Sequence, residues 1–510
     1  MKHSRLSSLF NFSSRFGFRT SPGVSLYSTT TMYRPHREPS RGTLNDLYRR
    51  ISRAGDHTAP ISPILDQWIE EGRTAPKGAL VTIIKELRQY KQYKHALEIS
   101  MWLSDKRYFE LTIADVAIRL DLIAKVHGIE QAEDYFNNIP KNLKVLEVYC
   151  ALLNSYARAK LVQKAEDIMQ KMRELGFART SLSYNNLLNL YYQTGNTDKF
   201  NVLMSEMKEK GIVHDKFTYC IQISAYAAAS DLEGIDKVMA EWESDPKVLM
   251  DWDSYSNVAI SYKKAGNVEK ALAMLERSEK LMSSSKRKRG AYEYLMTQYA
   301  ALGQKDRVMR LWELYKKHMK IYNRGYISIM TSVLKIGDIE SAEKIYDEWE
   351  SSNLSFDICI PNFLIGAYTR KGLVDKALVD KAESIVNRVI QKGEKPDARS
   401  WHYLARGYLD HDQIEKTVEL TRKALSVEGS RWTPDGHVVA ACMEYMKQKA
   451  DVEGAEEFIR LLGEKCSFPI SIQEKLLDFI NNEDSVTVEI GDLEWDRQNG
   501  VLKEADLGSN

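Results

Sequence analysis

The 510-residue chain is poor in the residues that interrupt helices or staple a fold. Its 12 prolines and 27 glycines fall below the usual shares of about 5% and 7%, which argues against a fold rich in strands and tight turns. The five cysteines lie far apart and form no CxxC pair, so neither a disulfide framework nor a structural zinc site is expected. No apolar run approaches about 18 residues, so no membrane span is expected. These absences favour a helical protein with single packed thiols in a reducing compartment.

The motifs of common active sites are missing as well. The chain has no GxxxxGK[ST] phosphate loop, no HExxH metal motif and no GxSxG nucleophile motif. His36 and Glu38 match the HxE of a nucleotide deaminase, but no downstream CxxC can supply the other zinc ligands. Carboxylates are spread over helical faces rather than gathered into a nuclease-like cluster. The sequence therefore predicts no catalytic residue, no metal site and no cofactor, and we do not expect an enzyme.

The net charge of the whole chain is small, but each end carries an excess of one sign. The 72 basic and 71 acidic residues give a net charge of +1. Residues 1–31 contain four basic residues, eight serines and no acid, which is typical of a transit peptide; arginines among leucines and aromatics favour the mitochondrion over the plastid. Residues 483–510 carry a net charge of −6 and form an acidic tail. The body between them is nearly neutral, so RNA binding would need a local stripe of charge.

A period of about 35 residues runs through the chain. Six tyrosines mark it, at spacings of 35, 35, 36, 37 and 34: Tyr149, Tyr184, Tyr219, Tyr255, Tyr292 and Tyr326. Glycines follow eleven residues after the tyrosine, or after Pro361 in its place: Gly195, Gly266, Gly303, Gly337 and Gly372. Alanines follow sixteen residues after the same landmark: Ala165, Ala271, Ala342 and Ala377. With apolar residues at helical spacing behind them, these landmarks predict helix, short turn and second helix.

One two-helix unit cannot bury its apolar face alone, so successive units must stack. The sequence therefore predicts an all-α fold, a right-handed α-solenoid of stacked helix-turn-helix repeats of about 35 residues. We place a linker with degenerate capping helices at 32–76, the repeat array at 77–482 and the acidic tail at 483–510. The weaker copies are expected at 77–112, 113–145, 358–397, 398–435 and 436–465.

Two further features concern packing and phosphate contact. The near-duplication LVDKALVDKA at 373–382 predicts a second helix that is longer by about one turn. Residues 286–289 (KRKR) form the one dense basic run, which we interpret as a solvated loop, with phosphate contact as the alternative. The large aromatic residues of the second helices are predicted to form the core between repeats: Trp242, Trp312, Tyr315, Tyr346 and Trp349.

The best copy, 181–215, reads SLSYNNLLNLYYQTGNTDKFNVLMSEMKEKGIVHD. Its Tyr-Asn near the start, Gly in the turn, Gly-Ile near the end and terminal Asp resemble the pentatricopeptide repeat family, P-class, particularly short plant organellar members. The resemblance covers roughly residues 77–465. A tetratricopeptide array, with units of about 34 residues, is the nearest alternative. The copies lack its Trp/Leu-Gly signature and its late proline.

The resemblance implies single-stranded RNA binding, with one base read per repeat by side chains of the solenoid's inner face. In the family, the reading pair is the residue after the tyrosine and the last residue of the repeat. The matching pairs here are Asn185 with Asp215 and Asn362 with Asp397, and by resemblance they favour uracil, then cytosine. An Asn amide offers a donor and an acceptor to a base edge, and Asp can orient that amide. The alternative interpretation of both asparagines is a solvated first-turn residue.

Other positions complete the candidate RNA-binding set. Leu182 and Phe217 adjoin Asn185, where apolar or aromatic faces would stack on its base. Ser256, and His402 with Asp435, can hydrogen-bond a base although they depart from the family's usual pair. The remaining pairs depart further: Cys150 with Thr180, Cys220 with Asp251, Glu293 with Tyr322, and Ile327 with Asp357. The code is therefore partly eroded.

Two functions remain open at this point. The first is a mitochondrial single-stranded RNA-binding repeat protein, with pyrimidine-rich RNA as partner, that acts in organellar RNA processing, stability, splicing or translation. The second is a structural or accessory scaffold subunit of the mitochondrial ribosome, which contacts proteins and structured RNA by shape. The eroded code, the nearly neutral body and the acidic tail favour the second.

Overall fold

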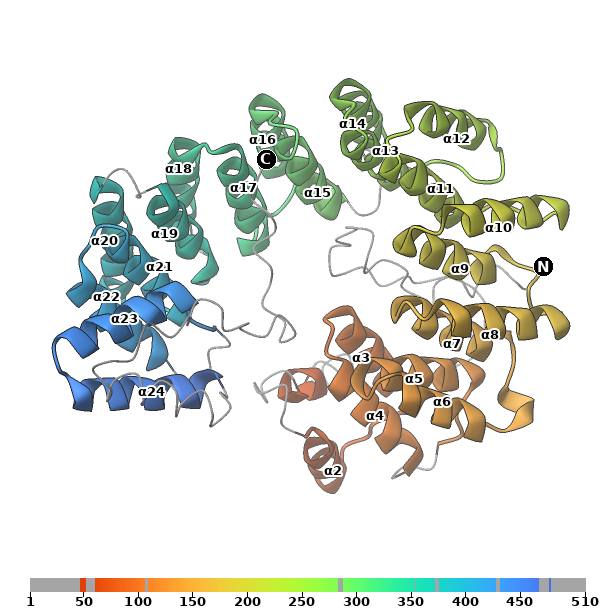
Figure 1. The fold of residues 1–510 in the computed structure, drawn as a ribbon, viewed down its shortest axis with the longest axis horizontal. Helices are drawn as coiled ribbons and strands as arrows, with labels where there is room; N and C mark the ends of the chain where they lie inside the picture. The colour runs from red at the N-terminus through yellow and green to blue at the C-terminus, as the bar shows by residue number, and fades with distance from the viewer. Residues whose placement is uncertain are drawn as a thin grey trace. The chain divides into compact units, whose positions relative to one another are not determined.

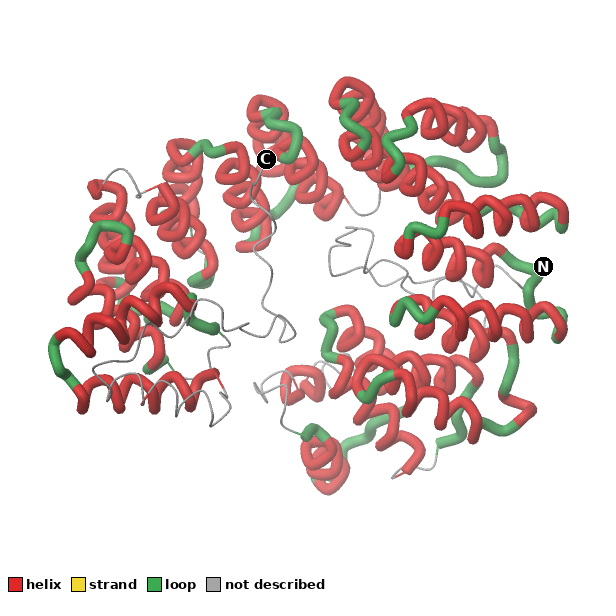
Figure 2. The backbone as a smooth tube through the Cα atoms, in the orientation of Figure 1, coloured by secondary structure: helices red, strands yellow, loops and turns green. Residues whose placement is uncertain are grey.

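The computed structural model describes residues 46–51, 60–105, 109–282, 288–352, 354–371, 376–427, 432–466 and 477. All regular secondary structure in these ranges is helical (Figures 1 and 2). The chain divides into two compact units, residues 1–287 and 288–510. The predicted all-α class is confirmed. The transit-peptide segment 1–31 and the acidic tail 483–510 lie outside the described residues.

The described part of the first unit starts with a short helix at 46–51 and α2 (Ser62–Glu70), followed by six helix pairs. In order, these pairs are α3 (Lys77–Gln89) with α4 (Tyr93–Asp105), α5 (Ile113–Val126) with α6 (Ile129–Asn138), α7 (Leu146–Arg158) with α8 (Val162–Glu174), α9 (Ser181–Thr194) with α10 (Thr197–Glu209), α11 (Lys216–Ala228) with α12 (Leu232–Ser244), and α13 (Trp252–Lys264) with α14 (Val268–Met282). A single 3-10 turn, η2 (Lys141–Leu143), precedes α7.

The second unit contains five pairs of the same kind among its described residues. They are α15 (Lys288–Ala300) with α16 (Lys305–His318), α17 (Asn323–Ile336) with α18 (Ile339–Glu350), α19 (Cys359–Lys371) with α20 (Lys376–Gln391), α21 (Ala398–Leu409) with α22 (Ile414–Leu425), and α23 (Gly436–Gln448) with α24 (Val452–Cys466). In each unit, the first helices of successive repeats pack on one another, as α7 does on α9 and α19 on α21. From α5 to α13 and from α15 to α23, the first helices therefore form a continuous layer within each unit.

The turn between the two helices of a repeat explains the periodic glycines. Gly195 ends α9 with φ 71° and Gly337 ends α17 with φ 86°, both in the left-handed region. Glycine adopts this conformation without a steric cost, which other residues pay. Lys160 and Ser230 occupy the corresponding turns of their repeats at φ 58° and 55°. The turn geometry is therefore kept where the glycine landmark is lost.

Large aromatic side chains fill the space between repeats, as predicted. The five predicted second-helix aromatics, Trp242, Trp312, Tyr315, Tyr346 and Trp349, are at most 5% exposed. The ring of Tyr219 stacks on Trp242, with centroids 5.2 Å apart and planes at 10°. The described cysteines are free, and burial raises the pKa of Cys150 to about 12, so its thiol is inert.

One of the four alanine landmarks does not lie in the core. Ala165, Ala271 and Ala342 are fully buried, but Ala377 is exposed, and Ala382 takes the core position in its repeat. The two alanines end the two copies of LVDKA. A spacing of sixteen residues reaches the alanine of the first copy, whereas the buried alanine belongs to the second copy. The same insertion makes α20 16 residues long, against 12 in α18, which agrees with the predicted extension of one turn.

A recurring group that we call the tyrosine latch joins neighbouring repeats. In the α9 repeat, the Tyr191 hydroxyl donates to Glu166 of α8 at 2.7 Å. Lys199 of α10 pairs with the same carboxylate at 2.7 Å and lies over the Tyr191 ring. Equivalent latches are Tyr156 with Glu133 and Lys164, Tyr262 with Asp236 and Lys270, and Tyr368 with Glu343 and Lys381. Each latch therefore joins one second helix to both helices of the next repeat.

Candidate RNA interface

The first predicted reading pair is joined directly by hydrogen bonds. Asn185, the fifth residue of α9, is 2% exposed, and its Nδ2 donates to Asp215 Oδ1 at 2.9 Å. The Oδ1 of Asn185 accepts from the Thr218 hydroxyl at 2.9 Å. Asp215 is the N-cap of α11 and also accepts from the Thr218 backbone N–H at 2.9 Å. The amide is therefore held at the junction between two repeats, with its orientation set by an acceptor on one side and a donor on the other.

The second pair repeats this geometry in the other unit. Asn362 of α19 is 7% exposed and donates from Nδ2 to Asp397 Oδ1 at 2.9 Å. Its Oδ1 accepts from the Ser400 hydroxyl at 2.6 Å, while the Ser400 backbone N–H donates to Asp397 at 2.9 Å. Each amide retains one N–H and one carbonyl lone pair beyond these bonds. Two asparagines in separate units are thus oriented in the same way by the same kind of neighbours.

Sequence reasoning missed the hydroxyl residue of this constellation. Thr218 and Ser400 each stand three residues after the terminal Asp of the repeat. At α11, Thr218 and Asp215 form the reciprocal bonds of a helix N-terminus, whereas at α21 the backbone N–H and the hydroxyl of Ser400 both donate to Asp397. The spacing Asp-x-x-Ser/Thr was therefore the available signal. Asp251 and Ser254 share it and make the same cap at α13.

The two predicted stacking residues occupy equivalent places in neighbouring repeats. Leu182 and Phe217 are the second residues of α9 and α11. Asn185 lies three residues after Leu182, and Asp215, the N-cap of α11, lies two residues before Phe217. Leu182 is half-buried, whereas the Phe217 side chain is 41% exposed. Exposed aromatic faces are what single-stranded RNA binders use to stack bases.

Ser256 does not offer its hydroxyl to a base. Its side chain is fully buried, and its hydroxyl lies 2.8 Å from the Ser278 hydroxyl of α14. Ser278 in turn donates to the Trp252 carbonyl at 2.6 Å. The short side chain is therefore used within its own repeat. Glu293 at the same place in α15 is also engaged, by the Tyr315 hydroxyl at 3.1 Å and the Arg324 guanidinium at 2.8 Å.

His402 and Asp435 are placed differently from the asparagine pairs. The imidazole is 9% exposed and lies against Trp432, with ring centroids 5.0 Å apart. Burial lowers the pKa of His402 to about 4, so the ring is neutral at physiological pH. Asp435 caps α23 and pairs with Arg406 at 3.2 Å, while His402 Nδ1 has no hydrogen-bond partner within the described part of the chain. The terminal Asp is present here, but its pairing partner is a cation from α21.

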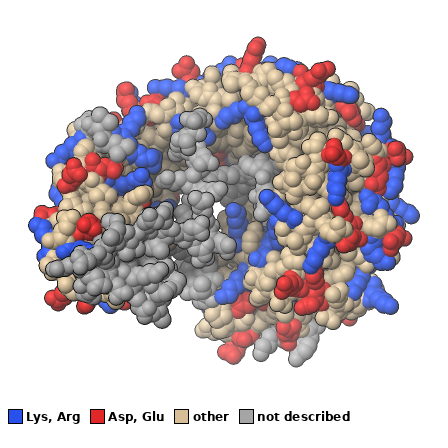
Figure 3. Space-filling view, in the orientation of Figure 1, with Lys and Arg blue, Asp and Glu red and all other residues tan. Residues whose placement is uncertain are grey.

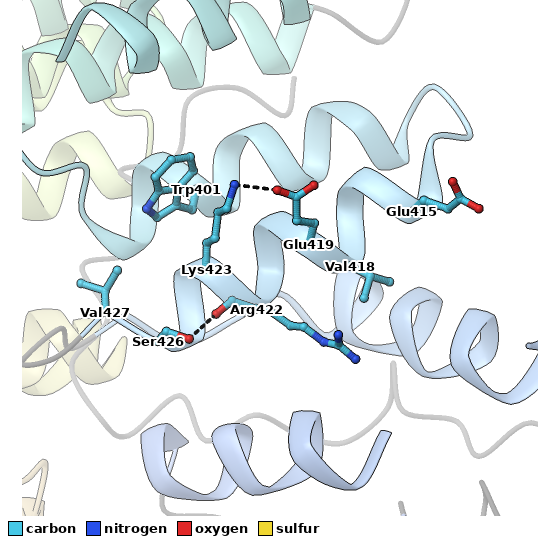
Figure 4. A pocket seen from close by; sticks show the side chains of 8 residues that line it. All are labelled: Trp401, Glu415, Val418, Glu419, Arg422, Lys423, Ser426 and Val427. Atoms are coloured by element: carbon cyan, nitrogen blue, oxygen red, sulfur yellow. Dashed lines mark hydrogen bonds and ion pairs between the residues drawn. The ribbon is translucent and has the colours of Figure 1, made fainter. Parts of the chain in front are cut away.

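Charge and cavities elsewhere do not suggest an active site. Figure 3 shows Lys and Arg interspersed with Asp and Glu over the visible face. Trp401 of α21 and side chains of α22 line a shallow depression of about 550 Å3 (Figure 4). There, Lys423 lies 5.3 Å from the Trp401 ring centre and pairs with Glu419 at 2.6 Å. Among the described residues, no group of His, Cys, Asp and Glu is arranged to hold a metal ion. None of the described helices has the length and apolar character needed to cross a bilayer.

Stacked helix pairs with hydrogen-bonded side chains at their junctions define a helical repeat protein. Family models agree: the PPR repeat family model matches residues 179–228, and the PPR repeat model matches residues 147–177 and 253–281. The chain is 43% identical over 419 residues to the Arabidopsis thaliana pentatricopeptide repeat-containing protein At2g20710, mitochondrial, covering 82% of this chain and 84% of that protein. The chain therefore belongs to the pentatricopeptide repeat family, as its sequence indicated.

Further similarities concern a ribosomal relative and a solved structure. The chain is 33% identical to the Arabidopsis thaliana large ribosomal subunit protein mL101 (rPPR4), covering 82% of this chain and 84% of that protein. It resembles the crystal structure of maize PPR10 with a TM-score of 0.47 at 17% identity, covering 87% of this chain. The chain spans 65% of the maize protein's length. The predicted mitochondrial localisation is confirmed by relatives that are named mitochondrial.

Proposed function

We propose that the protein binds single-stranded RNA in mitochondria and acts in organellar RNA processing, stability, splicing or translation by occupying a strand. The observation that carries this proposal is the identical setting of Asn185 and Asn362, each oriented by a terminal Asp and a Ser or Thr hydroxyl. The free N–H and lone pair of each amide match the donor and acceptor of a pyrimidine's Watson–Crick edge. We expect uracil, then cytosine, at these two positions.

Phe217 and Leu182 would stack on the base that Asn185 reads. Ser256 adds no base contact to this proposal because its hydroxyl is bonded inside its repeat. His402 and Asp435 remain candidates for contact, without the oriented amide of the two asparagine pairs. We propose no catalytic step, because occupying an RNA strand requires binding alone.

Base preference tests the proposal. Asn185→Ala with Asn362→Ala should abolish the preference for uracil over purines at two nucleotides while leaving weaker, sequence-independent binding. A good base contact contributes on the order of 1–3 kcal/mol, so each substitution should cost roughly tenfold in discrimination. Gel-shift titrations with U-rich RNA and single-base replacements measure it, with Asn189→Ala of α9 as the matched control. Unchanged base preference in the double variant would rule out the coded mode.

A second function is favoured by one relative. The similarity to large ribosomal subunit protein mL101 supports a role as an accessory subunit of the mitochondrial ribosome. Sedimentation of mitochondrial extract in a sucrose gradient distinguishes the two roles. Stable co-migration with the large ribosomal subunit supports the second role, and migration away from every large assembly excludes it.

A further inference from the structure

A buried arginine in the first unit pairs with no carboxylate among the described residues. Arg119 of α5 is 5% exposed, and its guanidinium donates to the Ser100 hydroxyl at 3.0 Å, to the Ser100 carbonyl and to the Ser104 hydroxyl at 3.0 Å. The hydroxyl of Tyr135 in α6 accepts a further bond from the same guanidinium. All of these acceptors are neutral. The cation is therefore hydrogen-bonded but lacks a counter-charge, which is a costly arrangement for a buried charge.

The place of Arg119 is apolar in the next two repeats. Arg119 is the seventh residue of α5, and the seventh residues of α7 and α9 are Leu152 and Leu187. Both leucines are at most 2% exposed and belong to the core. A leucine at this place in α5 would bury apolar surface without burying a charge. The sequence departs here from its own repeat pattern, and such departures are expected at functional sites.

Ser104 lies between this buried charge and the solvent. It is the penultimate residue of α4 and is half-buried, whereas Ser100 is 3% exposed. The Ser104 hydroxyl accepts from Arg119, and it lies 3.0 Å from the Met101 carbonyl and 2.8 Å from Asp105 Oδ1, either of which can accept its single proton. A serine oxygen at the end of a helix is thus within hydrogen-bond distance of a buried guanidinium.

We infer that Ser104 is a phosphorylation site and that Arg119 supplies the counter-charge for the phosphate. A protein kinase would transfer the γ-phosphoryl group of a nucleoside triphosphate to Ser104 Oγ. The bond from Oγ to phosphorus forms, the bond from phosphorus to the β–γ bridging oxygen breaks, the nucleoside diphosphate leaves, and the hydroxyl proton passes to solvent. Phosphoserine carries a charge of about −1.5 to −2 at neutral pH and three strong acceptor oxygens, which the neutral partners of Arg119 do not offer. The inference goes beyond the proposed RNA-binding function and does not depend on it.

Two groups oppose a phosphate at this place. Asp105 carries charge of the same sign, and the carboxyl end of α4 has a partial negative charge. Asp105 is exposed, so solvent and salt screen its repulsion. The Arg119 guanidinium is shielded from solvent, where charge-assisted hydrogen bonds are stronger. The attraction should therefore outweigh the repulsion, and the phosphate should tie the end of α4 to α5, across the junction of the first two helix pairs.

Thermal melting of the full-length chain with phosphoserine incorporated at position 104 tests the inference. We expect the phosphate to raise the melting temperature by about 3 °C. In the Arg119→Leu background the same phosphate should lower it, because only the repulsion remains. The matched control is phosphoserine at Ser244, an exposed serine that also ends a second helix and donates to the carbonyl three residues earlier, that of Glu241, at 2.8 Å. No arginine among the described residues is bonded to Ser244, so its phosphate should give no gain.

Two results would overturn the inference. If phosphate at Ser104 shifts the melting temperature equally in the wild-type and Arg119→Leu backgrounds, Arg119 does not receive the phosphate. Mass spectrometry of the protein purified from mitochondria should find phosphate on Ser104 in a fraction of the molecules, and this measurement needs no variant that must fold. A digest that recovers the Ser104 peptide only without phosphate would remove the modification itself. Neither result alters base preference, so the RNA-binding proposal stands or falls by its own test.

Discussion

The repeats that begin with α9 and α21 each consist of two helices and a terminal Asp, yet their fifth residues are used differently. Asn185 is bonded to Asp215 across the repeat junction, whereas His402 packs against Trp432 and leaves Asp435 to Arg406. In both repeats, the terminal Asp caps the next first helix. A terminal Asp therefore indicates a helix cap in the first place. In the α9 repeat it also accepts a hydrogen bond from the amide of the fifth residue.

The largest difference that we expect between the two repeats is a loss of stability at low pH in the α21 repeat. Burial lowers the pKa of His402 from 6.5 to about 4, so the unfolded chain takes up a proton first as pH falls. Stability is fully present above pH 6.5 and is lost between pH 6.5 and 4, by about 3 kcal/mol. Hydrogen exchange of α21 and α23 amides at several pH values measures the loss. His402→Gln should flatten the difference between pH 7 and pH 4.5, and the α9 repeat should lack this component.

Removing the two terminal carboxylates should cost different amounts. Asp215→Ala removes a helix cap and leaves the buried Asn185 amide without its acceptor, so we expect a loss of about 2 kcal/mol in the unfolding free energy. Asp435→Ala removes a cap and a partly exposed ion pair, with an expected loss of about 1 kcal/mol. Denaturation followed by circular dichroism, with local hydrogen exchange, compares them. Asp198→Ala, on the exposed first turn of α10, is the control, and equal losses for the first two would contradict the bonding described here.

Much of this architecture can be read from the sequence because its signals are local. Tyrosine, glycine and buried alanine recur at fixed spacing, and α9 and α21 begin at the residues where the repeats were placed. The side-chain directions at the junctions could not be read in this way. The sequence suggests that Ser256 could contact a base, but in the structure its hydroxyl is bonded to Ser278 of the second helix. The ion pairs of Asp121 with Arg88, Lys125 and Arg158 involve three helices, and no short sequence motif predicts them.

Giving the α21 repeat the missing amide should sharpen the comparison. His402→Asn with Arg406→Gln introduces a reading amide and releases Asp435 from its cation, so one more nucleotide should be discriminated. We expect a gain of about 1 kcal/mol, at the low end for a base contact, because Val438 offers no hydroxyl where Thr218 does in α11. Gel shifts with an RNA series varied at one added position measure the gain. Arg406→Gln alone is the matched control and should add no base preference.

The α21 repeat has a contact related to the tyrosine latch, and both repeats should respond equally to the loss of the tyrosine hydroxyl. Tyr191 donates to Glu166 at 2.7 Å and Tyr408 donates to Glu383 at 2.6 Å, each with a lysine of the second helix over its ring. Replacing either tyrosine by phenylalanine removes one hydrogen bond to a carboxylate that water still reaches, so each should cost about 1 kcal/mol. Thermal denaturation measures the losses against Tyr90→Phe, a mostly exposed position. Matching losses would locate the difference between the two repeats at the fifth residue alone, while a much larger loss at Tyr408 would mean that the α21 repeat differs in its packing as well.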